Sequence, residues 1–153
     1  MSFDSNLEKL GIRLPDAPKA IASYIPAQIS GNLVFTSGQI PLKAGKLDLI
    51  GKVGHEVSIE DAGEAAKICC LNALAAIHSA IGDLNKITKV VKMGVMVACV
   101  PSFTDQHLVA NYASNLLLDI FGEKGRHARY AIGVISLPLN ACVELELIVE
   151  FSE

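Results

Sequence analysis

The chain has 153 residues, of which 51% are apolar and 19% charged, and its formal net charge is −3 with a pI near 5.8. This length forms one domain, residues 1–153, with a sizeable core. The acidic balance gives no electrostatic reason to bind nucleic acid, and the histidines and cysteines lack the spacing of metal ligands. We therefore expect neither metal nor cofactor, and the apolar content indicates a surface buried against other subunits.

The sequence carries no obvious targeting segment. Its first residues have neither the basic flank nor the apolar stretch of a signal peptide. The longest apolar runs are interrupted by glycine or charge before they reach the length that spans a membrane. We therefore expect a soluble, cytoplasmic protein that does not insert into a membrane.

The N-terminal third predicts an arm followed by short strands. Residues 1–18 are expected to pack on the domain as a short helix or arm that ends at its two prolines. Residues 20–30 and 32–37 predict two strands, joined by a hairpin turn at a Gly-Asn pair. A short third strand is expected at about residues 49–53.

Two segments have the apolar spacing of helices, and each begins with the sequence of a capping box. The first is expected to follow Ser58 as its N-cap and to end at about Ile81. The second is expected over residues 104–121, after a capping box that starts at Ser102, and a glycine follows each helix. Their predicted buried stripes are Ala62, Ala66, Cys69, Ala73, Ile77 and Ala80 in the first helix, and Val109, Ala113, Leu116, Leu117 and Ile120 in the second.

The remaining segments predict strands. Residues 86–100 are apolar on both faces, so we expect helices to cover one face and another subunit to cover the other. The last two strands are expected at residues 129–136 and 141–151, and the final one alternates an apolar face with a face that carries glutamates. The order ββ(β)αβαββ predicts an α+β domain with a mixed sheet and two long helices on one face.

Two polar features lie at strand ends. Residues 34–42, VFTSGQIPL, are either an edge turn or a ligand-facing strand end where glycine lets backbone N–H groups approach an anion. Arg129 is the one cation of an otherwise apolar strand, and we expect it beside Glu144 and Glu146 of a neighbouring strand. Such an arginine is either a structural ion pair or a clamp for a carboxylate. The sequence shows no Ser–His pair, Cys–His pair or phosphate-binding loop.

Together, Tyr24, the segment FTSGQIP (35–41) and the segment ARYAIGVISLPLNACVELE (128–146) resemble the Rid family, also called YjgF or L-PSP endoribonuclease-like proteins. The longer N-terminal arm is similar to the longer branch of that family. The resemblance implies a chorismate-mutase-like fold and a homotrimer with three clefts between subunits.

The resemblance also implies roles for individual residues. Arg129 would hold the carboxylate of a 2-imino or 2-enamino acid, and Glu144 would hold or activate a water. Ser37 and Gly38 would line the same cleft, and Tyr24 would pack on the ligand.

The floor of the cleft departs from the typical deaminase, because Ala131 stands where that enzyme has Cys and Gly133 where it has Glu.

Three functions follow as alternatives. The first is a hydrolase that releases ammonia from imino acids, and the second is a non-catalytic trimer that binds a small carboxylate such as a keto acid through Arg129. The third is an endoribonuclease or translation inhibitor, against which the low pI and the lack of a basic aromatic groove argue.

Overall fold

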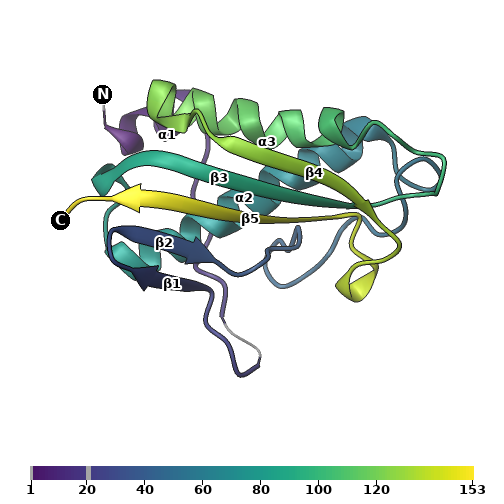
Figure 1. The fold of residues 1–153 in the computed structure, drawn as a ribbon, viewed down its shortest axis with the longest axis horizontal. Coiled ribbons are helices and arrows are strands. Elements are labelled where there is room, and N and C mark those ends of the chain that lie inside the picture. Colours follow the sequence, from purple (N-terminus) through teal and green to yellow (C-terminus); the bar gives the residue numbers. More distant parts are fainter. Residues whose placement is uncertain (1, 20–21) are drawn as a thin grey trace.

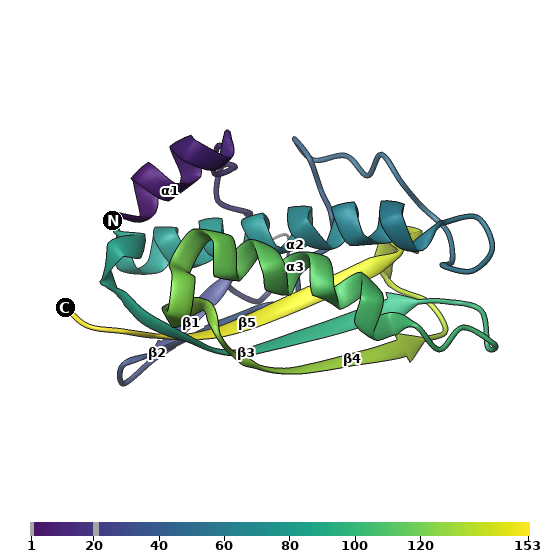
Figure 2. The same cartoon turned by 90° about the horizontal axis from the view of Figure 1, so that it is seen from above.

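The computed structural model of the chain describes residues 2–19 and 22–153. Its five strands form one sheet in the order β1-β2-β5-β3-β4 (Figure 1). The helices lie on one face of this sheet, as Figure 2 shows, so the predicted α+β architecture is confirmed. In chain order the elements are α1 (Phe3–Leu10), β1 (Ala27–Ser30), β2 (Leu33–Thr36), α2 (Ile59–Ile81), η1 (Leu84–Lys86), β3 (Ile87–Ala98), α3 (Gln106–Phe121), η2 (Gly122–Gly125), β4 (Ala128–Val134), η3 (Pro138–Asn140) and β5 (Val143–Phe151).

The strand order corrects one prediction. β5 pairs antiparallel with both β2 and β3, whereas β4 pairs in parallel with β3 at the edge of the sheet. The expectation that the last two strands are neighbours is therefore wrong, because β3 lies between them. The connection through η3 carries the chain past β3 to pair on its other side.

Helix α2 begins and ends as predicted. The Ser58 hydroxyl oxygen accepts a hydrogen bond from the backbone N–H of Asp61 at 3.1 Å, and Gly82 ends the helix with φ +80°. The predicted stripe is buried except for Ala80, which is exposed. By length and composition α2 could cross a membrane, but most of its residues are buried inside the domain.

Helix α3 begins later than predicted. Its N-cap is Asp105, whose side chain makes no capping hydrogen bond, so the capping box expected at Ser102 is wrong. The chain turns at this point, where the Phe103 N–H bonds the Val100 carbonyl at 3.0 Å. The predicted apolar stripe of the helix is nevertheless buried as a whole.

The shorter elements differ in extent. Helix α1 ends at Gly11, which has φ +65°, before it reaches the prolines. The predicted hairpin is confirmed, although β1 is shorter than expected, and residues 20 and 21 lie outside the described part of the chain. The strand expected at 49–53 is wrong: Ile50 and Val53 form only isolated bridges there.

Strand β3 carries the centre of the core. Met93, Val95 and Val97 are fully buried on the face that the helices cover, as predicted. Two register irregularities near the start of the strand place Val90 in the core, whereas its neighbour Val91 is only partly buried. The opposite face, which we call the outer face, carries no helix among the described residues (Figure 2).

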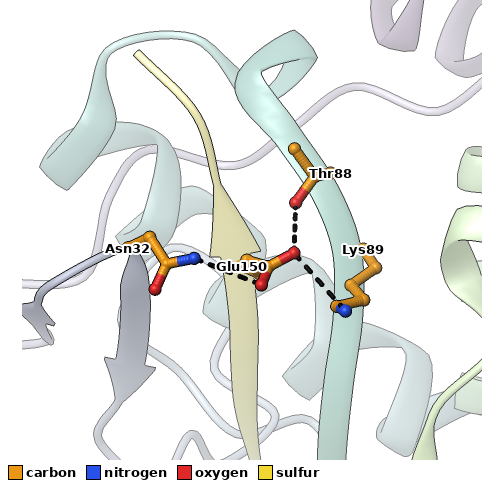
Figure 3. A network of polar contacts seen from close by, with 4 residues as sticks. All are labelled: Asn32, Thr88, Lys89 and Glu150. Atoms are coloured by element: carbon orange, nitrogen blue, oxygen red, sulfur yellow. Dashed lines mark hydrogen bonds and ion pairs between the residues drawn. The ribbon is translucent and has the colours of Figure 1, made fainter.

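Glu150 on β5 contacts β3 and the turn between β1 and β2 at one end of the sheet. Its carboxylate accepts hydrogen bonds from Thr88 Oγ1 at 2.8 Å and Asn32 Nδ2 at 3.2 Å, and Lys89 Nζ lies 3.5 Å away (Figure 3). The Thr88 hydrogen bond, followed by Lys89 and Asn32, lowers the pKa of Glu150. This glutamate therefore serves the sheet as an ionised structural group.

Gly125 allows η2 to pack closely against α3. A Cβ at this position would overlap the backbone carbonyl oxygen of Leu117, which cannot move without distorting the helix. We expect Gly125→Ala to lower the free energy of unfolding by about 2 kcal/mol or more. Urea denaturation measures this, with Glu123→Ala, an exposed position of the same turn, as the control expected to change little. Equal stability of the two variants would contradict the close contact.

Candidate functional site

The outer face carries a pair of carboxylates in its centre. Glu144 lies opposite Met96 of β3, and Glu146 lies opposite Gly94, so both point to the same side of the sheet. Each is partly buried. The alternation predicted for the last strand is confirmed, with Val143, Leu145, Leu147 and Val149 buried on the helical side.

Gly38 makes room for Glu144. A Cβ built on Gly38 would collide with the Glu144 carboxylate, with Oε1 as the nearest atom. The segment that follows β2 is held in place by Gln39, which exchanges backbone hydrogen bonds with Leu145 at 2.8 and 3.0 Å. The structure therefore brings Gly38 and Glu144 together, and the glycine leaves the strand end open beside the acid.

Ser37 and Tyr24 lie near this strand end in different ways. Ser37 uses both of its donors inside the chain, because its hydroxyl bonds the Ile25 carbonyl at 2.6 Å and its N–H bonds the Pro26 carbonyl at 2.8 Å. It therefore fixes the segment that enters β1. Tyr24 is 52% exposed, so its ring is open to a ligand or a second chain.

Tyr130 lies across the sheet next to the same acids. Its hydroxyl donates to Glu146 Oε1 at 3.2 Å, and its ring covers Gly94, where a Cβ would collide with it. Burial, together with the charge of Glu146, raises the pKa of Tyr130, so the phenol keeps its proton and stays a donor. Sequence reasoning missed Tyr130, and the signal that could have found it is a glycine in a buried strand.

The two ends of β5 place carboxylates in opposite electrostatic environments. Burial raises the pKa of Glu144, and the negative charge of Glu146 raises it further. Glu150 has its pKa lowered by its three partners. Glu144 is therefore the carboxyl group suited to take up and release a proton closer to neutral pH.

The raised pKa of Glu144 predicts a pH-dependent stability. The protonated carboxyl is preferred in the folded state, so its contribution is present below the ordinary pKa of 4.5 and is lost as the pH rises through the folded value. We expect the stability of Glu144→Gln relative to the wild type to increase from about pH 4 to about pH 7. Chemical denaturation across this range measures the difference, and a constant difference would show that Glu144 is not destabilised by its surroundings.

Arg129 lies on the other face of the sheet. It is the second residue of β4, opposite Met93, and its Nη1 donates to Asn111 Oδ1 at 2.9 Å and to Ser114 Oγ at 3.0 Å, both on α3. The expectation that Arg129 lies beside Glu144 within one chain is therefore wrong. The guanidinium has no carboxylate partner among residues 2–19 and 22–153, so the ion-pair interpretation does not hold there either.

The two positions that depart from the typical deaminase are on the same side as Arg129. Ala131 is partly buried and packs against the core. At Gly133, a Cβ would come within 2.8 Å of both Cys99 Sγ and Gln106 Nε2, so these side chains occupy the space that a larger residue would need. Neither residue has a polar or nucleophilic side chain, and contact of Ala131 with a ligand stays a prediction.

A Ser–His pair, which the sequence did not show, lies next to Arg129. Ser114 Oγ on α3 is 3.0 Å from His127 Nε2, and His127 Nδ1 is 2.6 Å from the carbonyl oxygen of Gly125. These side chains and Arg129 line one pocket, together with Leu118 and Arg126. No short motif joins Ser114 to His127, because a helix end and a 3₁₀ turn separate them along the chain.

A family model and a related protein each match nearly the whole chain. A family model described as "YjgF/chorismate mutase-like, putative endoribonuclease" matches residues 4–151. Protein TCP17 of Trypanosoma cruzi is 40% identical over 149 residues, which cover 97% of this chain and 93% of that protein.

Solved structures show the same fold. The protein Atu1372 of Agrobacterium tumefaciens, described as having unknown function, is 48% identical with a TM-score of 0.91, over 98% of this chain and 92% of that one. A "putative endoribonuclease" of Shewanella oneidensis MR-1 is 32% identical with a TM-score of 0.94, over 99% of this chain and 100% of that one. The chain therefore belongs to the YjgF/chorismate mutase-like family, also called the Rid family.

Proposed function

We propose that the protein is an enamine/imine deaminase, which hydrolyses 2-imino acids and their 2-enamino tautomers to 2-keto acids and ammonia. The observation that carries this proposal is Glu144, a partly buried acid with a raised pKa next to the open backbone at Gly38. An imine of a 2-keto acid is already electrophilic, so the protein needs only to orient the substrate, direct a water and move protons.

The proposed site lies between copies of the chain. Arg129 and Glu144 are on opposite faces of one sheet, so a small substrate that contacts both must take them from two chains. β4 is an edge strand, and it and the loop after it expose Ile132, Ile135 and Leu139 by 49, 81 and 71%. Apolar residues exposed at a sheet edge favour a contact with another subunit, and we propose the homotrimer of the family.

In this cleft, Arg129 of one copy holds the substrate carboxylate, and Gly38 and Glu144 of the next copy face the imine. The substrate reacts as the protonated imine, C=NH2+. Ionised Glu144 accepts a proton from water as the water oxygen bonds to the imine carbon, and the C=N π electrons move to nitrogen, which gives a neutral carbinolamine. The protonated acid then delivers this proton to the amino group. The C–N bond breaks, ammonia leaves with the electron pair, and the hydroxyl of the carbinolamine gives its proton to the Glu144 carboxylate, which leaves the 2-keto acid.

A non-catalytic protein that binds a keto acid is the second candidate. It is favoured by Ala131 and Gly133, which leave the carboxylate clamp intact but remove two side chains of the typical deaminase. An endoribonuclease has less support, since the net charge is −3 and the outer face presents carboxylates, which repel phosphates.

The test is the release of ammonia and 2-ketobutyrate from 2-iminobutanoate, which a threonine dehydratase generates in the assay. We expect the wild-type protein to accelerate hydrolysis above the rate in buffer with dehydratase alone. A rate equal to that of buffer, from a protein that still binds 2-ketobutyrate, would contradict the deaminase and support the binding protein.

A further inference from the structure

The chain of hydrogen bonds behind Arg129 has a defined direction. A carbonyl oxygen can only accept, so the 2.6 Å contact with the Gly125 carbonyl places a hydrogen on His127 Nδ1. In the neutral ring, Nε2 is then the acceptor, and the Ser114 hydroxyl 3.0 Å away donates to it. This fixes the Ser114 hydrogen on the histidine side and leaves the serine oxygen free to accept.

The serine oxygen accepts from Arg129. Nη1 has two hydrogens, and Asn111 Oδ1 and Ser114 Oγ each take one, at 2.9 and 3.0 Å. Both hydrogens of Nη1 are therefore bonded to side chains of α3. Within the described residues, Nε and Nη2 have no hydrogen-bond partner, and this edge of the guanidinium is one that can hold a carboxylate with two parallel hydrogen bonds.

We propose that Ser114 and His127 are positioning residues, which fix the guanidinium of Arg129 so that its Nε–Nη2 edge faces the ligand carboxylate. The inference rests on the proposed function for the class of ligand, a small 2-imino or 2-keto carboxylate. Its physical basis is preorganisation: an arginine with a fixed plane loses less rotational freedom on binding than a mobile one. Ser114 and His127 take part in no chemical step of the proposed mechanism, and positioning Arg129 is the function that the geometry assigns to them.

A serine next to a histidine could also be a nucleophile, but the contacts favour positioning. The Ser114 oxygen accepts a hydrogen bond from the Arg129 cation, and this contact draws electron density from the oxygen and makes it a weaker nucleophile. Ser114 lies inside α3, where the backbone N–H groups are engaged in the helix and cannot stabilise an oxyanion.

The experiment measures the affinity of full-length variants for 2-ketobutyrate by calorimetry, after melting curves show that each is folded. We expect Ser114→Ala and His127→Ala each to weaken binding about five- to tenfold, the net effect of one lost hydrogen bond. Ser114→Thr keeps the hydroxyl and should stay within about twofold of the wild type. Lys89→Ala is the control for loss of a cation outside this pocket, since that lysine is 57% exposed and lies 3.5 Å from Glu150.

The outcomes separate this inference from the proposed function. If Arg129→Ala loses binding while Ser114→Ala and His127→Ala bind like the wild type, the positioning function is wrong and the clamp stands. If Ser114→Thr binds as weakly as Ser114→Ala, the effect comes from packing, which also overturns the positioning function.

In the imine assay, Ser114→Ala should raise KM with kcat nearly unchanged; loss of kcat alone would make Ser114 a nucleophile. A wild-type protein that binds no 2-ketobutyrate contradicts both proposals.

Discussion

Replacing Arg129 by alanine is expected to weaken binding of 2-ketobutyrate by about 30-fold to several thousand-fold, which corresponds to about 2–5 kcal/mol. The physical reason is that the guanidinium forms two charge-assisted hydrogen bonds with a carboxylate, and no other cation of the described residues is held in place beside it by α3. Calorimetry measures the loss, and the protein should keep its melting temperature and its oligomeric state.

Two results would contradict this account of Arg129. Unchanged affinity in Arg129→Ala would show that the carboxylate binds elsewhere. Unfolding or dissociation of the variant would show that the hydrogen bonds to Asn111 and Ser114 serve mainly to hold α3 on the sheet. Lys89→Ala tests whether general positive charge is enough, and it should change affinity by less than about threefold because that side chain is largely exposed and does not line the Arg129 pocket.

Replacing Glu144 by glutamine is expected to lower kcat for imine hydrolysis by about 10²- to 10⁴-fold, the usual contribution of general acid–base catalysis. The amide has nearly the same size and can sit beside Gly38, but it cannot take a proton from water or return it to nitrogen. Affinity for 2-ketobutyrate should remain near the wild-type value, since Arg129 supplies the charge that holds the carboxylate.

Glu150→Gln is the matched control for this substitution, because Glu150 is on the same strand but is bonded to Thr88 and Asn32 (Figure 3). We expect it to keep most of the activity. If Glu144→Gln retains the wild-type kcat, a different group must move the protons. If both variants lose activity equally, the effect comes from the sheet as a whole.

The periodicity of the sequence was enough to predict the layers of the fold. The stripes of α2 and α3 and the alternation of β5 are local patterns, and each is buried on the predicted side apart from Ala80. Hydrophobic burial is the main force that selects these faces, so a pattern of apolar residues carries the information directly.

The strand order could not be read in the same way. Consecutive strands are neighbours in about two thirds of cases, which made the segments around Arg129 and Glu144 look adjacent. Here β3 is inserted between them, and the pairing depends on the packing of α3 and on long-range contacts that leave no local trace. The register then sets the faces: Arg129 pairs with Met93 and Glu144 with Met96, two positions of β3 that face opposite sides of the sheet.

The Ser114–His127 pair was missed for a related reason. The serine is within a helix and the histidine follows a 3₁₀ turn, so their contact depends on how closely η2 approaches α3. Gly125 permits that approach, but in the sequence it is simply one glycine in a turn. Contacts that depend on the packing of elements are visible only in the folded chain.

The most direct test of a site between chains is complementation by mixed oligomers. Arg129→Ala and Glu144→Gln, each almost inactive alone, are co-expressed with different tags, and oligomers that carry both tags are purified. In a mixed trimer, one of the interfaces combines an intact Arg129 with an intact Glu144, so purified mixed trimers should recover about a third of the wild-type activity on 2-iminobutanoate. Mixed oligomers that are no more active than either parent would contradict a site built from two copies of the chain.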